Sequence, residues 1–564
     1  HPVAHSFPTR RSSDLEGLLE DLFSNVNRSS FNSTFWLWEN FATYQNSIGK
    51  HNFSVMVGTS AQNFDVRTLS ATAEYESDAF TEISNSALVN NSSSSFTEES
   101  LASVFGRLTY NYDERYLLTA NVRRDGSSKF GPNNKFGVFP SFSAGWRISE
   151  EAFFDSQLVN DLKLRGGWGQ VGSDAIGNFK YLAALNTGFN YPFGNQQGAS
   201  SLGAALLELG NPNIQWETST EWSLGADLGM LENRLTVTAD YFEKTRTDML
   251  LTLPLAGISG LTQTVDNVGE LLNTGFEFST NYRKATGRFT YDLGVNFTTF
   301  TNEVVDIDIL NEIVASTYSG SGAVALIRRG QPLGVFYGLV TEGLFQTPEE
   351  VRQANAIDGN EDTPYQLAGT APGDFRYRDL NGDGRITGDD RQIIGNPVPD
   401  FTYGINGSLQ YGNFDLNFQF FGVQGNDVLN LSRSILESSG RAFNKSSTVV
   451  NAWNGPGTSN SIPRPIVTDP NQNVRVGTHL VEDGSFLRLR MLQLGYNLPP
   501  ELLSSLGISK FRAYIAGQNL LTFTNYSGND PEIGFDSNST AANGIDQDLD
   551  PQARTYTISV NVSF

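Results

Sequence analysis

The sequence of 564 residues contains no cysteine, which excludes disulfide bonds, thiol catalysis and cysteine-ligated zinc sites. Histidine is nearly absent as well, since the chain has four and two of them, His1 and His5, lie at the extreme N-terminus. No apolar run approaches the roughly 20 residues that a transmembrane helix requires. Acidic residues outnumber basic ones by 61 to 38, and the formal net charge of −23 argues against nucleic acid or an anionic membrane surface as a partner.

Aromatic residues, by contrast, make up 12% of the chain, and glycine is frequent, with 55 residues. The aromatic residues lie in short blocks where they alternate with polar ones. In one such block the apolar residues Phe414, Leu416, Phe418 and Phe420 alternate with Asp415, Asn417 and Gln419. A period of two gives a strand one apolar and one polar face. Tilted strands of about ten residues can cross a bilayer, so the pattern predicts an all-β fold, a transmembrane antiparallel β-barrel.

Fifteen segments of membrane length show this strand pattern. They lie near 31–45, 50–59, 101–112, 115–124, 137–147, 161–170, 214–228, 234–246, 271–283, 288–301, 400–411, 414–422, 485–497, 511–523 and 553–564. The connections between them alternate between short and long without a change of phase, and two on the short side, 148–160 and 498–510, are of middling length. The long, polar connections lie near 60–100, 171–213, 302–399, 423–484 and 524–552. Outer-membrane barrels have short periplasmic turns and long external loops, so we expect the long connections to face outside.

The two ends of the chain have different character. Residues 1–15, HPVAHSFPTRRSSDL, show no strand pattern and no signal-peptide core, and we interpret them as a non-native tail before a barrel portion at 16–564. The alternation of connections would start the first strand outside, which predicts that the beginning of the barrel is missing. The last strand ends on an aromatic residue and places Tyr556, Ile558, Val560, Val562 and Phe564 on one face. It resembles the terminal strand by which bacterial outer-membrane proteins are recognised for insertion.

A calcium-type loop lies in the connection before strand 400–411. Asp379, Asn381 and Asp383 occupy positions 1, 3 and 5 of the loop, the Arg385 carbonyl position 7 and Asp390 position 12. Calcium takes six to eight oxygen ligands, and this spacing supplies them from one curled segment, with glycine at position 6. Asp390 stands where Glu is usual, and its shorter side chain weakens the case for a bidentate ligand. The alternative is a polar turn without an ion; in either case the role would be structural.

Several segments resemble the SusC/RagA family of TonB-linked outer-membrane transporters. They are RRDGSSKF at 123–130, FGVFPSFSAGWRISEEAFF at 136–154, LKLRGGWGQVG at 162–172, NPNIQWETSTEWSLGADLGM at 211–230, NVGELLNTGFEF at 267–278, GQPLGVFYGLVTEGLF at 330–345, the stretch 374–422 and the stretch 495–534. They follow the order of the family and cover most of 101–564, whereas 16–100 match less distinctly.

The resemblance implies uptake of large nutrients, oligosaccharides or peptides, across the outer membrane. It implies a SusD-like surface lipoprotein as a lid, contact with outer-membrane lipid, and coupling to TonB through an N-terminal plug and TonB box that this sequence does not show. It also implies that the 15 or 16 strands belong to a barrel of 22. Without plug and TonB box, we expect residues 1–564 alone not to support energised uptake.

Patterns of enzymatic chemistry are weak in this chain. Gly167, Gly169 and Gly172 match GxGxxG but end a predicted strand rather than open a helix, so a dinucleotide site is disfavoured. Outside the tail only His51 and His479 remain, and we interpret both as solvated or strand-end residues. The tryptophans favour an interfacial aromatic girdle over sugar stacking; they are Trp36, Trp38, Trp146, Trp168, Trp216 and Trp222. We therefore predict that the protein is not an enzyme.

Two other functions remain open at this point. One is a TonB-dependent siderophore or vitamin receptor, whose barrel would look similar but which the family segments disfavour. The other is a secreted, calcium-stabilised adhesion or glycan-binding β protein. The latter would not predict alternating short and long connections.

Overall fold

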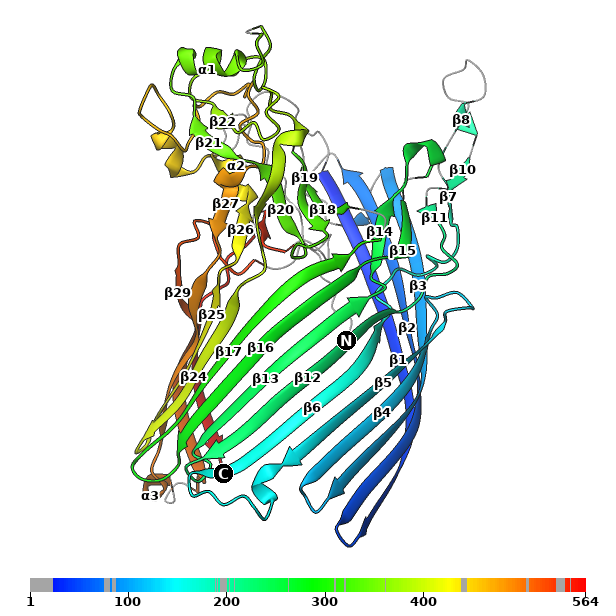
Figure 1. Ribbon diagram of the computed structural model, residues 1–564, viewed down its shortest axis with the longest axis vertical. Helices are drawn as coiled ribbons and strands as arrows, with labels where there is room; N and C mark the ends of the chain where they lie inside the picture. Colours follow the sequence, from blue (N-terminus) through cyan, green and yellow to red (C-terminus); the bar gives the residue numbers. More distant parts are fainter. Residues whose placement is uncertain are drawn as a thin grey trace.

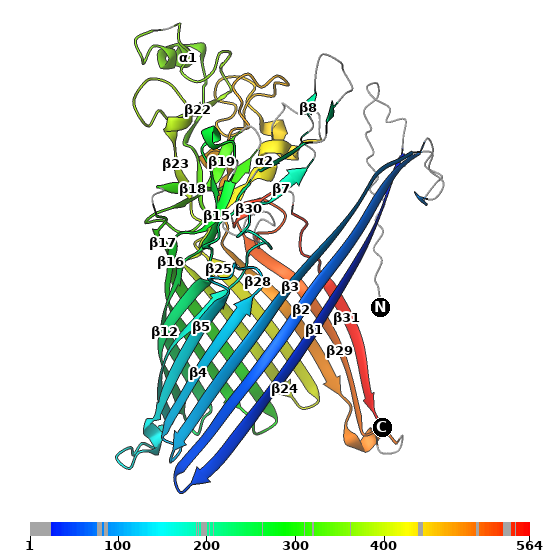
Figure 2. The same ribbon diagram turned by 90° about the vertical axis from the view of Figure 1, so that its right-hand side faces the viewer.

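In the computed structural model, fifteen long antiparallel strands form one curved and tilted sheet, with a smaller set of elements above one end of it (Figures 1 and 2). The structure describes residues 24–564 except 76–81, 84–87, 188, 190, 193–199, 202, 207, 262, 309–310, 319–320, 361, 438–443, 504–506, 534–542 and 548. The tail at 1–15 lies outside the described residues. In the described part, no helix is long and apolar enough to cross a membrane.

The sheet strands follow one another in chain order, each paired with the preceding and following one. They are β1 (Ser24–Ile48), β2 (His51–Tyr75), β3 (Leu88–Tyr112), β4 (Tyr116–Ser127), β5 (Phe136–Arg147), β6 (Val159–Ser173), β12 (Glu217–Met230), β13 (Leu235–Thr247), β16 (Glu270–Lys284), β17 (Phe289–Asp306), β24 (Phe401–Tyr411), β25 (Phe414–Gln424), β28 (Phe486–Asn497), β29 (Lys510–Thr524) and β31 (Thr555–Ser563). Each of the fifteen predicted strands is therefore present. Short and long connections alternate as predicted except around β5, where 128–135 on the head side is shorter than 148–158 on the opposite side.

The first three strands are much longer than predicted. β1, β2 and β3 have 25 residues each, and β2 pairs with β3 from His51 and Tyr112 up to Glu74 and Leu88. The prediction that 60–100 is a loop is therefore wrong for most of that range. Residues 92–97 are four Ser, one Phe and one Thr, without the apolar alternation of a lipid-facing segment, and they are held in β3 by backbone pairing with 66–71 of β2. The ladder consequently continues past the membrane-length part of these strands (Figure 2).

The two faces of the sheet differ in character. Tyr556, Ile558, Val560 and Val562 alternate along β31 and Phe564 follows it directly; all five are exposed, and the period of two places them on one face, as predicted. On β4, Val122 points outward, whereas the neighbouring Arg123 lies on the inner side and bonds to Asp125 and Ser103. An apolar outer face and a polar inner face are what lipid outside and water inside require of a barrel wall.

The three connections 307–400, 425–485 and 525–554 together form the part we call the head, which lies above one end of the sheet (Figure 1). Its elements are β18 (Glu312–Tyr318), β19 (Gly322–Arg328), β20 (Val335–Leu339), β21 (Thr341–Leu344), α1 (Pro348–Asn355), β22 (Phe375–Tyr377), β23 (Arg391–Gly395), β26 (Asp427–Asn430), α2 (Leu431–Leu436), β27 (Val481–Asp483) and β30 (Ile545–Asp546). Two buried apolar clusters hold it together. Phe336 and Leu429 lie in one, and Phe345 and Tyr377 lie in the other.

Two further groups of elements lie at the ends of the sheet. On the head side, the connections 174–216 and 248–269 carry β7 (Leu185–Thr187), β8 (Tyr191–Pro192), β9 (Ser200–Ser201), β10 (Ala204–Leu206), β11 (Glu208–Leu209), β14 (Leu250–Pro254) and β15 (Gln263–Asn267). At the opposite end the connections are short, and the helix α3 (Pro500–Leu503) lies in one of the two longer ones (Figure 1).

Candidate functional site

The calcium-type loop lies in the head between β22 and β23. The Asp379 carboxylate accepts hydrogen bonds from the backbone N–H groups of Gly382 and Gly384, at 2.7 and 2.8 Å. Asp383 accepts from the N–H of Arg385, at 2.8 Å. The spacing recognised in the sequence therefore forms a tight, self-bonded loop. In the described part of the chain, no three His, Asp or Glu side chains converge closely enough to hold a metal ion.

Asp390, the last residue of the predicted ligand set, is fully buried. Its two carboxylate oxygens accept from the backbone N–H groups of Leu380 and Thr387, at 2.9 and 2.7 Å. Arg385 was predicted to contribute its backbone carbonyl. Its side chain points to Asp358, at 3.3 Å. Burying a carboxylate is costly unless it is paired, and the ion pairs among the described residues do not include Asp390.

The strand β22, which leads into this loop, is clamped by side chains from a distant connection. Asp374, fully buried, accepts two hydrogen bonds from the Arg464 guanidinium, at 2.8 and 2.9 Å. The Phe375 N–H donates to Asn473 Oδ1, and the Phe375 carbonyl accepts from the Asn471 side chain. These contacts join the connections 307–400 and 425–485 into one body. No local pattern predicts these contacts, because the partners lie 90 to 98 residues apart in the chain.

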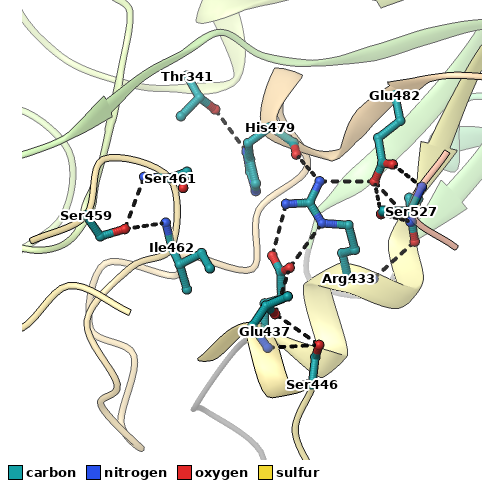
Figure 3. Close-up of polar contacts among 12 residues, drawn as sticks. Thr341, Arg433, Glu437, Ser446, Ser459, Ser461, Ile462, His479, Glu482 and Ser527 are labelled. Carbon is teal, nitrogen blue, oxygen red and sulfur yellow. Dashed lines mark hydrogen bonds and ion pairs between the residues drawn. The ribbon is translucent and has the colours of Figure 1, made fainter. Parts of the chain in front are cut away.

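A second polar cluster joins three parts of the head (Figure 3). Arg433 on α2 pairs with Glu437 and with Glu482 on β27, each at 3.1 Å, and also donates to the His479 carbonyl. Glu482 in turn accepts from the backbone N–H and the hydroxyl of Ser527, at 2.8 Å each. The cluster therefore ties α2 and β27 to the connection that follows β29.

The surroundings of the His479 side chain differ from the solvated environment predicted for it. Its Nδ1 lies 2.9 Å from the Thr341 hydroxyl (Figure 3). Its ring packs against the Phe375 ring with the planes tilted by 32° and the centroids 4.2 Å apart. Desolvation of the ring, and then the nearby Arg433 charge, lower the pKa of His479 to about 3. The imidazole is therefore neutral at physiological pH, and the interpretation of His479 as a solvated residue is wrong. His51, in contrast, lies at the start of β2, as predicted for a strand-end residue.

The inner wall of the sheet carries charges that neutralise one another. Arg165 on β6 donates to Asp240 at 2.6 Å and to Asp227 at 3.2 Å. Among the C-terminal strands of the sheet, Arg512 on β29 pairs with Asp415 on β25 at 2.6 Å. Such cross-strand pairs let strands carry charge on the wet face without leaving single unpaired groups.

The glycine motif and the tryptophans can now be placed. Gly167, Gly169 and Gly172 all lie within β6, which agrees with the interpretation of the motif as part of a barrel strand. Trp36, Trp38, Trp146 and Trp168 are exposed on sheet strands. Trp216 is instead buried, with its ring 5.1 Å from Phe130 and 5.5 Å from Phe139. The girdle interpretation is therefore wrong for Trp216, which packs under a connection.

Fifteen sequential antiparallel strands with an apolar outer face and a polar inner face define a transmembrane β-barrel protein of the outer membrane. The chain belongs to the family described as TonB dependent receptor-like, beta-barrel, because the family model matches residues 6–520.

Individual proteins support this assignment. The chain is 36% identical to TonB-dependent receptor P3 of Formosa agariphila over 94% of this chain and 52% of that protein. It is 30% identical to TonB-dependent receptor SusC of Bacteroides thetaiotaomicron, over 93% of this chain and 49% of that protein. Its fold matches a structure of the RagAB peptide transporter with a TM-score of 0.79 at 24% identity, covering 96% of this chain and 56% of that one. The resemblance to the SusC/RagA family is confirmed, and the chain spans about half the length of these relatives.

Proposed function

We propose that this chain forms the barrel wall of a TonB-dependent importer of large nutrients, oligosaccharides or peptides. The observation that carries the proposal is the inner wall, a polar surface of paired charges enclosed by an apolar outer face. Similarity to receptors named TonB-dependent, and to a peptide transporter in fold, supports it. The partners would be TonB and a SusD-like surface lipoprotein that lids the head side. Transport needs no catalytic residue, and we propose none.

The test compares three strains that carry the full-length protein, lack it, or carry it without TonB. Each is grown in a medium of mixed oligosaccharides and peptides, and mass spectrometry follows the disappearance of each component. We expect at least one component to be depleted only when the protein and TonB are both present. An identical depletion profile in the three strains would contradict the proposal.

We propose further that Asp379, Asn381, Asp383, the Arg385 carbonyl and Asp390 hold a structural Ca²⁺ ion. Two features support it: a buried carboxylate at Asp390 without a cationic side chain beside it, and two further carboxylates within five residues of one loop. Asp390 Oδ1 and both Asp379 oxygens keep a second lone pair after each accepts one N–H donor. Asp383 and Asn381 are exposed and bonded to each other within the loop, at 3.0 Å from Asn381 Nδ2 to Asp383 Oδ2 and 2.9 Å from the Asp383 N–H to Asn381 Oδ1. Bound calcium would offset the repulsion between these carboxylates.

Replacing Asp383 with Ala should therefore expose the head to protease, while the barrel still inserts. Limited proteolysis of the full-length protein, with calcium and with chelator, measures this. Affinity should be modest, with a Kd of roughly 10⁻⁴–10⁻³ M as in extracellular calcium modules. The matched control is Asp389→Ala, which removes a neighbouring exposed carboxylate outside the predicted ligand set. Cleavage of the wild-type protein that does not change on chelation would show that the loop is only a turn.

A further inference from the structure

The turn between β16 and β17 lies at the end of the sheet opposite the head, and two exposed basic residues flank it (Figure 1). Lys284 is the last residue of β16, and Arg288 directly precedes β17. The ion pairs of the described residues include neither of them. Cations at three other turns of this end do have acidic partners, and these pairs are Lys50 with Asp113, Arg147 with Glu150 and Arg234 with Glu232. The turn at 284–288 therefore carries positive charge that no carboxylate of the described chain neutralises.

Both cations lie on the lipid-facing side of the sheet. Lys284 follows Phe276 and Tyr282 at even positions of β16, and a period of two places the three residues on one face of the strand. Phe276 and Tyr282 are exposed, as apolar and aromatic residues of the outer face are. The Arg288 guanidinium lies over the ring of Tyr411, 5.1 Å from its centroid, and Tyr411 is exposed at the end of β24. The two charges thus stand at the lower edge of the outer wall rather than inside the barrel.

A row of aromatic rings lies directly beside the two cations. The Tyr282 and Tyr291 rings have centroids 5.6 Å apart, and the Tyr291 and Phe289 rings are equally close. Phe289 in turn lies opposite Tyr411 in the strand register. Tyrosine and tryptophan are enriched where a membrane protein crosses the boundary between lipid and water, because their rings suit the level of the headgroups. The row therefore marks the membrane boundary, and the adjoining basic side chains reach the depth at which phospholipid phosphates lie.

No acidic residue lies on the outer wall around this turn. The outward positions of β16, β17, β24 and β25 are the even ones of 276–284 and 414–420 and the odd ones of 289–297 and 401–411. Apart from Lys284 they hold only aliphatic and aromatic residues, one threonine and one glycine. The net charge of −23 argues against an anionic membrane surface for the chain as a whole, but this edge of the wall has the opposite local sign. It therefore attracts an anion whose remainder is apolar.

We infer that Lys284 and Arg288 bind the phosphate headgroup of an anionic phospholipid in the inner leaflet of the outer membrane. The guanidinium fork matches two phosphate oxygens, and the Lys284 ammonium adds a second charge-assisted contact. The acyl chains of the same lipid lie along the apolar wall above the aromatic row, where Phe276 and Phe278 stand on β16. The site goes beyond the proposed uptake function, because it fixes the depth of this side of the barrel in the membrane. It rests on the expectation that the short connections face the periplasm.

The test titrates lipid into the purified full-length protein in a neutral detergent and measures the tightest binding step by native mass spectrometry. The probes are phosphatidylglycerol, phosphatidylcholine with the same acyl chains, and glycerol 3-phosphate as a soluble competitor. We expect tighter binding of phosphatidylglycerol, and no competition from glycerol 3-phosphate because it lacks the acyl chains. Lys284→Gln and Arg288→Gln should each weaken phosphatidylglycerol about fivefold, and the double variant about thirtyfold, with phosphatidylcholine unchanged. Exchanging the two cations, Lys284→Arg with Arg288→Lys, keeps the charge and should keep most of the affinity.

The matched control is Arg283→Gln, which removes an exposed charge from the same turn. Arg283 lies at an odd position of β16, on the inner face and opposite Asp292, so this variant should bind both lipids as the wild type does. Three results would overturn the inference: equal affinity for the two lipids, unchanged phosphatidylglycerol affinity in the double variant, or an equal loss in Arg283→Gln. Displacement of the lipid by glycerol 3-phosphate would identify a site for free phosphate and would also overturn it. An error in the topology is detected separately, by cysteine labelling of intact cells.

Discussion

Removing the last ten residues, 555–564, is expected to lower the amount of assembled protein in the outer membrane by more than tenfold. β31 pairs with β29 along its whole length, from Ser563 opposite Lys510 to Thr555 opposite Gln518. Without it, the backbone N–H and C=O groups along that edge of β29 would face lipid unpaired. Each unsatisfied group in hydrocarbon costs several kcal/mol, so the barrel should not insert.

The measurement is the level of heat-modifiable, folded full-length protein in outer-membrane fractions. The control variant carries Thr557→Ala and Ser559→Ala, which change only the inner face of β31 and should assemble normally. A truncated protein that reaches the membrane at the wild-type level and still shifts on heating would contradict the assignment of β31 as a barrel strand.

Arg488→Ala is expected to release the segment that follows β29, residues 525–533, from the wall. Arg488 is almost fully buried and donates to Asp530 at 2.5 Å, to Glu532 at 2.9 Å and to the Thr522 hydroxyl at 3.0 Å. Its removal leaves the buried Asp530 carboxylate without this partner and close to Glu532. Breaking a buried pair from one side costs about 3–5 kcal/mol.

Hydrogen exchange of residues 525–533 in the full-length protein measures this release, and we expect protection there to fall by two orders of magnitude or more. Arg490→Ala is the matched control, because Arg490 is less buried. Its ion pair is with Glu532, which keeps Arg488 as a partner, and its guanidinium also lies over the Phe421 ring, 5.0 Å from the centroid. Adding Asp530→Asn and Glu532→Gln to Arg488→Ala should restore part of the protection. Exchange that is the same in the wild type and in Arg488→Ala would refute the anchoring role.

The membrane-length parts of the strands could be predicted because the pattern that identifies them lies within a few consecutive residues. An apolar residue at every second position, as in 414–420, identifies both the strand and its lipid face, and short turns such as that at Gly412 mark its end. The same reasoning fails where β1, β2 and β3 leave the membrane. There Ser, Thr and Asn replace the apolar residues, and a paired polar strand looks like a loop in sequence.

The candidate sites likewise divide into those with a local signal in the sequence and those without one. The loop from Asp379 to Asp390 was found because its spacing is contained in twelve residues. The clamp between Asp374 and Arg464 depends on tertiary contacts, which no local pattern encodes. His479 was misplaced for a related reason, since the residues that desolvate it come from β21 and β22.

The central claim is that these strands cross the outer membrane with the long connections outside. Single cysteines test it most directly, because residues 1–564 contain none of their own. In the full-length protein, freed of any other cysteine, we expect cysteines at Ser93, Asn133 and Val467 to react with an impermeant thiol reagent on intact cells. Cysteines at Asn233 and Ala285 should react only after the cells are broken. Labelling of Asn233 and Ala285 on intact cells, with the first three positions protected, would contradict the account.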